Sequence, residues 1–290
     1  MKIGYPCINK SIGCTPNKTF RLASYSEDLL KEKIKNNLQC LKKTLEFNSK
    51  NNLLFFRIGS PLIPFASHPV CKFNWKKYFK KDFKEIGEYI KKNKFRISMH
   101  PDQFVLINAK NPEITKKSIK ELDYHCSLLD LLGLDDSAKV QIHVGGVYGD
   151  KEGSIERFIK TYKKLPNKIK KRLVIENDHI SYSLNDCLKI SKKIKIPIVF
   201  DSLHHECLNN KETFKQAVAE ASKTWKAKDG CLMIDYSNQK ANSIKGSHSQ
   251  HINIKKFKIF LKEIKKIKAD IMLEIKDKEK SALKAVELIK

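Results

Sequence analysis

The chain has 290 residues, of which 41% are hydrophobic, and its 58 Lys and Arg against 32 Asp and Glu give a formal net charge of +26. The apolar fraction excludes a disordered chain, and the low Gly and Pro content excludes a fibrous one. No run approaches the roughly 18–20 apolar residues of a membrane span, and the first ten residues lack the apolar core of a signal peptide, so we expect neither membrane insertion nor export.

Eight short apolar runs are typical of buried parallel strands. In chain order they cover residues 2–5, 53–58, 96–99, 140–144, 173–175, 198–200, 231–234 and 271–273. Between them, apolar residues recur at helical spacing over residues 30–45, 79–90, 115–132, 154–163, 184–194, 213–225, 254–267 and 281–289. This alternation predicts a single-domain α/β fold over residues 1–290, a (β/α)8 TIM barrel, with a doubly wound open sheet as the alternative. No GxGxxG or GxxxxGK[ST] motif follows a strand, so we expect no nucleotide cradle of those types.

Acidic or imidazole side chains stand at or near the C-terminal end of six predicted strands. They are His100, His143, Glu176, Asp201, Asp235 and Glu274, and His204 and His205 follow closely behind Asp201. In a barrel these strand ends converge on the face that carries the active site. The pattern therefore predicts a polar site built from distant parts of the chain.

Carboxylates and imidazoles that converge in a crowded site lose their charge unless a cation neutralises them. Histidine with Asp and Glu, and no Cys nearby, suits Zn²⁺ or Mn²⁺, and the number of ligands predicts two or three ions. Metal ions a few ångström apart are a recurring device for phosphodiester cleavage. A polar barrel mouth without metal and a metal-dependent sugar isomerase are the alternatives at this point.

The positive charge and the cysteines are less informative. Nearly all of the positive charge is lysine, which fits either a polyanion such as DNA or a compositional drift with solvated lysines on helix faces. The eight cysteines are scattered and form no CxxC pair, so we predict free thiols of a reducing compartment.

Seven motifs resemble those of the UV damage endonuclease family. They are GYPCINKSIGCTPNKTFRLA, FRIGSPLIPFASHP, SMHPDQF, IHVGGVYGDK, VIENDH, VFDSLHHE and LEIKDKEKSAL, and they run over nearly the whole chain. The resemblance implies a TIM barrel related to the endonuclease IV group, with a divalent metal cluster that is usually manganese, zinc and magnesium being the alternatives. It also implies an enzyme that nicks duplex DNA immediately 5′ to cyclobutane pyrimidine dimers and 6-4 photoproducts, and in some members at abasic sites, leaving a 3′-hydroxyl and a 5′-phosphate.

The resemblance implies a ligand set at matching positions. The implied metal ligands are His100, His143, Glu176, Asp201, His204, His248 and Glu274, to which Asp235 is added in place of a family histidine. The implied catalytic residues among them are Glu176, Glu274, His100, His143 and Asp201. Glu176 would bridge a first ion to a second one held also by Asp201 and Glu274, and His204 with His248 would hold a third.

Four other histidines are assigned outside the ligand set. His68 of ASHP matches a family histidine near the cluster and is an uncertain ligand. His205, like His179, adjoins a ligand and is expected behind it, and His251 follows the KGSH motif closely enough to be undecided.

The resemblance also implies contacts to DNA. Gln103 and Phe104 stand where the family carries Gln-Tyr, residues that enter the duplex and fill the gap left by the lesion. Tyr5 matches an aromatic residue of the damage pocket, and Lys151 of YGDK is a candidate phosphate contact.

Two departures from the family concern the metal site. Where the family has Lys-x-His, with the lysine often carboxylated, this chain has Met233 and Asp235. Asp235 can supply a ligand oxygen, whereas Met233 cannot imitate a carboxylated lysine. We therefore expect altered metal sites near His204 and His248.

The sequence as a whole predicts a metal-dependent DNA repair endonuclease. Its expected partner is damaged double-stranded DNA, its expected state is a monomer, and its expected location is the cytoplasm, at the nucleoid if the source is prokaryotic. A sugar isomerase of the same barrel superfamily and a damage-binding protein that does not cleave are the alternatives.

Overall fold

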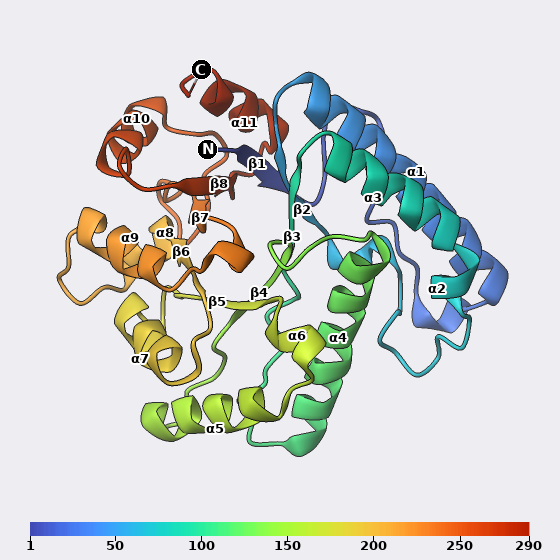
Figure 1. Cartoon of the computed structure of the whole chain (residues 1–290), viewed down its shortest axis with the longest axis horizontal. Helices are drawn as coiled ribbons and strands as arrows, with labels where there is room; N and C mark the ends of the chain where they lie inside the picture. The colour runs from blue at the N-terminus through green and yellow to red at the C-terminus, as the bar shows by residue number, and fades with distance from the viewer. Residues whose placement is uncertain (290) are drawn as a thin grey trace.

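The computed structural model describes residues 1–289 as a closed barrel of eight parallel strands, in which each strand pairs with the next and β8 pairs with β1 (Figure 1). The strands are β1 (Ile3–Pro6), β2 (Phe55–Ile58), β3 (Arg96–Met99), β4 (Lys139–His143), β5 (Leu173–Glu176), β6 (Ile198–Asp201), β7 (Leu232–Tyr236) and β8 (Ala269–Leu273). All eight predicted strands are confirmed, and the open sheet is excluded. The predicted domain of residues 1–290 ends at a residue that lies outside the described range.

Helices surround the barrel and connect consecutive strands (Figure 1). They are α1 (Glu27–Lys50), α2 (Trp75–Tyr78), α3 (Lys80–Lys92), α4 (Pro112–Leu131), α5 (Lys151–Lys164), α6 (Asn167–Lys170), α7 (Leu184–Ile194), α8 (Ser202–Cys207), α9 (Phe214–Lys223), α10 (Ile254–Glu263) and α11 (Glu279–Val286). The short helices α2, α6 and α8 were not predicted, because four to six residues carry too little periodicity to be recognised.

Several of the long helices begin at residues that cap them, and each buries one apolar face. The side chain of Ser26 accepts a hydrogen bond from the backbone N–H of Leu29 at the start of α1, and Ser183 and Asp186 form a capping box at the start of α7. The buried face of α1 carries Leu30, Ile34, Leu38, Leu41 and Leu45. This is the spacing that predicted the helix.

Inward-facing side chains fill the barrel in tiers. The lowest tier, at the N-terminal ends of the strands, holds two buried ion pairs, Arg96 to Asp270 at 3.0 Å and Lys139 to Asp229 at 2.6 Å. The next tier is apolar and fully buried, and consists of Phe55, Val174, Val199, Met233 and Met272. Because side chains alternate along a strand, Asp235 and Glu274 stand one tier above Met233 and Met272. The C-terminal ends of the strands therefore carry a polar site on an apolar floor.

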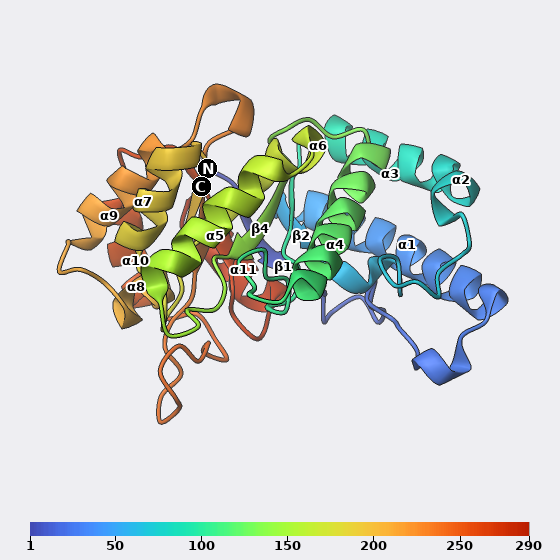
Figure 2. The same cartoon turned by 90° about the horizontal axis from the view of Figure 1, so that it is seen from below.

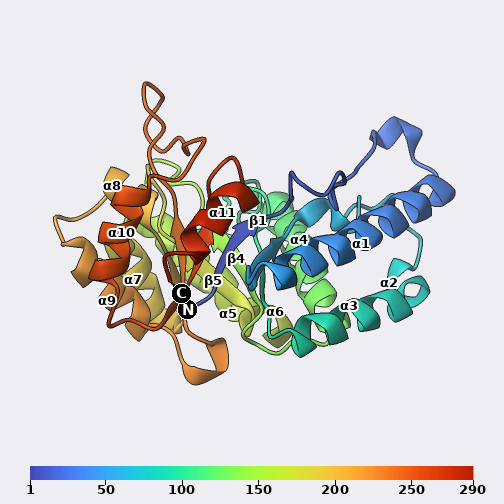
Figure 3. The same cartoon turned by 90° about the horizontal axis from the view of Figure 1, so that it is seen from above.

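Two long loops project from the C-terminal side of the barrel, as the side views in Figures 2 and 3 show. One follows β1 and the other follows β7, where Gln239 and His248 form an isolated antiparallel bridge. The N-terminus lies on the opposite side. No helix among the described residues is long and apolar enough to cross a membrane.

The loop after β1 is tied to α1 by a disulfide. The Cα atoms of Cys14 and Cys40 lie 6.0 Å apart and their sulfur atoms are bonded. The prediction that all eight cysteines are free thiols was wrong for these two. The spacing of 26 residues gives no hint of the pairing; it arises because the loop folds back onto the middle of α1.

Candidate metal centre

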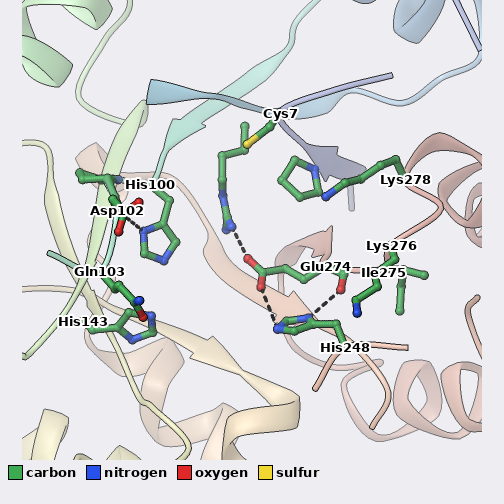
Figure 4. Close-up of a pocket in the computed structure, with 13 residues that line it drawn as sticks. Cys7, His100, Asp102, Gln103, His143, His248, Glu274, Ile275, Lys276 and Lys278 are labelled. Atoms are coloured by element: carbon green, nitrogen blue, oxygen red, sulfur yellow. Dashed lines mark hydrogen bonds and ion pairs between the residues drawn. The ribbon is translucent and has the colours of Figure 1, made fainter. Parts of the chain in front are cut away.

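A cavity of about 520 Å³ opens at the C-terminal ends of the strands (Figure 4). Four predicted ligands line it, namely His100, His143, His248 and Glu274. In Figure 4, His100 and His143 lie on one side of the cavity, and Glu274 and His248 lie on the other. The structure thus brings side chains from β3, β4, β8 and the loop after β7 to one place.

The first group of potential ligands joins β3, β4 and β5. Nε2 of His100 lies 3.2 Å from Oε2 of Glu176, and Nε2 of His143 lies 3.7 Å from the same oxygen. The ring of His100 is oriented through its other nitrogen, which lies 2.9 Å from the carbonyl oxygen of Pro101. A backbone carbonyl behind the ring is the usual way to aim a histidine nitrogen at a metal.

The second group is built around Asp201, which ends β6 and caps α8. Its Oδ1 accepts a hydrogen bond of 2.7 Å from the backbone N–H of His204, so this carboxylate also fixes the turn. Its Oδ2 is buried without a hydrogen-bond partner among the described residues, 3.7 Å from Nδ1 of His204. The same Nδ1 lies 3.1 Å from Oε1 of Glu176. Glu176 therefore stands between the two groups, with one oxygen toward each.

A third group consists of carboxylates from β6, β7 and β8. Asp201, Asp235 and Glu274 each place an oxygen within 4.8 Å of the others. Unlike the first two groups, this one contains a cation of the chain, because Arg57 pairs with Asp235 at 2.8 Å and also with Glu274. His248 faces Glu274 from the other side, with Nε2 3.7 Å from Oε2.

Burial and mutual charge determine the pKa values in the first two groups. Burial, reinforced by the neighbouring carboxylates and opposed by His204, raises the pKa of Asp201 well above its ordinary value. Burial would also raise the pKa of Glu176, but the imidazoles of His143, His100 and His204 outweigh it and lower that pKa well below its ordinary value. Burial opposes protonation of His204, but Asp201 and Glu176 outweigh it and raise its pKa to about 11. The carboxylates thus attract positive charge strongly.

The donor set fits divalent metal ions. Imidazole nitrogens and carboxylate oxygens, without a thiolate among them, suit Mn²⁺, Zn²⁺ or Mg²⁺ better than softer metals. The buried oxygen of Asp201 and the buried Nδ1 of His143 have no partner within residues 1–289. A cation near Asp201 and Glu176 would neutralise charge that is otherwise buried at a high cost in free energy.

The other two histidines near the candidate ligands, His179 and His205, lie in different surroundings. His179 stacks on His204 with 5.0 Å between ring centroids, as expected for a residue behind a ligand. His205 points away from the ligands and contacts Phe200 and Phe214 at 5.1 and 6.1 Å between ring centroids, so its predicted place behind the cluster was wrong. The reason is that successive residues of α8 face different directions.

His68 and His251 contact none of the predicted ligands. His68 is exposed, and its Nδ1 accepts a hydrogen bond from the backbone N–H of Val70. His251 lies 2.8 Å from Asp277 with most of its ring in solvent. Neither residue is positioned as a ligand in this structure.

The predicted DNA contacts lie in different surroundings. Gln103 lines the cavity, and Phe104 beside it is 73% exposed, which is unusual for an aromatic ring. Lys151 lies 3.0 Å from Asp186, so its ammonium group already has a partner. Tyr5 is fully buried and its hydroxyl donates a hydrogen bond of 2.6 Å to Asn48, which contradicts a direct contact with a lesion in this conformation.

Several residues of the site were missed in the sequence. Arg57 and Gln141 lie inside strands that were treated as apolar. The available signal is a charged or amide residue one or two positions before the end of a strand. Asn177 donates a hydrogen bond of 3.0 Å to the carbonyl oxygen of Asp201 and so joins β5 to β6. Lys278 lines the cavity, and burial lowers its pKa.

Comparisons of this chain with a family model and with known proteins point to the same family. The model of the family described as UV-endonuclease UvdE matches residues 1–290. The UV DNA damage endonuclease of Clostridium perfringens (strain 13 / Type A) is 45% identical over 292 residues, covering 100% of this chain and 71% of that protein. The UV DNA damage endonuclease of Bacillus thuringiensis subsp. konkukian (strain 97-27) is 34% identical over 297 residues, covering 99% of this chain and 94% of that protein.

Solved structures agree. The crystal structure of SacUVDE is 47% identical and superimposes with a TM-score of 0.96, covering 100% of this chain and 98% of that one. Endonuclease IV from Thermus thermophilus gives a TM-score of 0.59 at 14% identity, covering 86% of this chain and 93% of that one. At that identity the likeness shows the fold alone.

Proposed function

The chain belongs to the UV-endonuclease UvdE family and is an endonuclease, and from this premise we propose that it nicks duplex DNA immediately 5′ to UV photoproducts. The proposed substrates are cyclobutane pyrimidine dimers and 6-4 photoproducts, with abasic sites as a further substrate, and the proposed products carry a 3′-hydroxyl and a 5′-phosphate. The observation that supports this most strongly is the convergence of two ligand groups on Glu176 at the open end of the barrel.

We propose a cluster of divalent ions, with Mn²⁺ as the first candidate, in which His100, His143 and Glu176 hold one ion and Glu176, Asp201 and His204 hold another. When bound, such ions lower the pKa of a water and stabilise the charge that develops on the phosphate oxygens. The chain itself contributes geometry: the Pro101 carbonyl aims His100, and the α8 cap leaves one oxygen of Asp201 free. His248 and Glu274 complete the wall of the cavity.

Lesion selectivity follows from the loop after β3. A damaged dinucleotide is poorly stacked, so opening the duplex there costs less free energy than in intact DNA. Gln103, which lines the cavity, and Phe104, whose ring is exposed, are the side chains that would occupy the opened stack. Lys276 and Lys278 line the same cavity and offer positive charge to flanking phosphates.

One assay tests the proposal against the other activities considered. A duplex with a single defined photoproduct is incubated with the protein and Mn²⁺, with and without chelator, and the nick is mapped. We expect one nick 5′ to the lesion that chelator abolishes, and that Glu176→Gln abolishes while the circular dichroism spectrum stays unchanged. Equal cutting of the undamaged duplex, or lesion binding without a nick, would overturn the proposal.

A further inference from the structure

Arg57 is a buried cation inside the third group of carboxylates. Its side chain is 3% exposed, and it comes from the middle of the barrel wall on β2. Its Nη2 donates hydrogen bonds of 2.8 Å to both oxygens of Asp235, and its Nη1 pairs with Glu274. In Figure 4 a dashed line joins Glu274, the partner of Arg57, to His248. The guanidinium thus lies where the third group would otherwise hold a metal ion.

Both oxygens of Asp235 already accept hydrogen bonds. Besides Arg57, the amide of Gln141 donates a hydrogen bond of 2.6 Å to Oδ2 of Asp235 and one of 2.5 Å to Oε2 of Glu176. The oxygen of Gln141 accepts a hydrogen bond of 3.1 Å from Nη2 of Arg57. A buried carboxylate whose two oxygens already pair with a guanidinium and an amide has less to gain from a metal than an unpaired one.

Asp201 provides the contrast within the same group. Both carboxylates are fully buried, but Oδ2 of Asp201 has no partner in the described part of the chain, whereas both oxygens of Asp235 are paired. Over residues 1–289, the first two groups of ligands contain no Lys or Arg among their ion pairs, and only the third one does. An ion beside Asp235 would also be repelled by the guanidinium at close range.

We infer that Arg57 acts as a built-in cation in place of a third metal ion, so that Asp235 is the counter-ion of Arg57 and not a metal ligand. This rests on the proposed metal cluster, which then contains two ions that share Glu176. Through its pair with Glu274, Arg57 is a positioning residue for the far wall of the cavity. Met233 belongs to the fully buried apolar tier below and supplies no charged group at that level.

The test is the number of ions bound, measured on the whole protein. Protein saturated with Mn²⁺ is separated from free metal on a desalting column and its manganese content is measured by mass spectrometry. We expect two ions per chain in the wild type, two in Asp235→Asn, and one in Asp201→Asn. Three ions in the wild type that fall to two in Asp235→Asn would overturn the inference.

Two further variants separate a metal effect from a folding effect. Arg57→Met removes the cation and is expected to raise the number of bound ions from two to three. If Arg57→Met and Asp235→Asn both bind two ions, Asp235 is not a ligand, but the inferred role of Arg57 is overturned. Asp270→Asn is a matched control, because it breaks the buried Arg96–Asp270 pair in the lowest tier of the barrel. It should lower the melting temperature without changing the number of bound ions. Failure of the proposed function can be told from failure of this inference. The first gives no bound manganese or no nick, whereas the second gives a third ion at Asp235 and leaves nicking intact.

Discussion

Replacing Phe104 with alanine separates folding from lesion recognition. The ring is 73% exposed, so its removal should change the free energy of unfolding by no more than about 0.5 kcal/mol. If the ring stacks in an opened duplex, its loss should cost about 1–3 kcal/mol of binding free energy. That corresponds to a dissociation constant for the photoproduct duplex about 5- to 150-fold higher.

The measurement is fluorescence anisotropy with a labelled duplex that carries one photoproduct, beside the same duplex without it. Phe104→Tyr retains the ring and should bind like the wild type. Tyr78→Ala is a matched control, because Tyr78 is an aromatic residue on α2 with 62% exposure that does not line the cavity. Unchanged lesion affinity in Phe104→Ala, or an equal loss in Tyr78→Ala, would refute the assignment of Phe104 to the lesion.

Three other predictions follow from the structure. Because the pKa values of Asp201 and His204 are raised, the folded metal-free protein keeps protons that the unfolded chain loses. Four histidines whose pKa is lowered on folding oppose this only below about pH 7.5, so the melting temperature should fall as pH rises from about 7.5 to about 9, and a rise over this range would contradict the sign. Calorimetry in buffers of different ionisation enthalpy should also show protons released when Mn²⁺ binds. Cys14→Ser should lower the free energy of unfolding by about 3.5 kcal/mol, because the disulfide that it removes joins residues with a sequence separation of 26. The stability of this variant should not change when reductant is added. A wild type that melts at the same temperature with and without reductant would disprove the contribution of the disulfide. Lys278→Met should weaken binding to damaged and intact duplexes alike and reduce the salt dependence by about one ion, while the exposed Lys266, which is remote from the cavity, should do neither when replaced.

The barrel was predictable from the sequence because its signals are local. The strand over residues 96–99 and the helix over residues 184–194 were predicted with the bounds that the structure has. Each is a complete run of one periodicity with clear ends, as the cap at Ser183 illustrates. The register between neighbouring strands has no such local signal, because it is set by closure of the sheet.

The convergence of the candidate ligands was predictable for a different reason. A residue such as Glu176 or Asp201 directly at a strand end must face the open end of a barrel, whichever helices surround it. The direction of His205 could not be predicted, because it depends on how α8 starts one residue after β6. The pair between Arg57 and Asp235 joins residues 178 positions apart, and no local pattern announces it.

The tiered filling of the barrel has a consequence for the order of events. Ion pairs such as Arg96 to Asp270 and the apolar tier around Met233 close the barrel below the ligands. Ions and duplex would then enter through the same opening, and a duplex seated over the cavity would keep bound ions from exchanging with solvent. The protein would have to load its metal before it meets DNA, and it would hold that metal until the nicked strand departs.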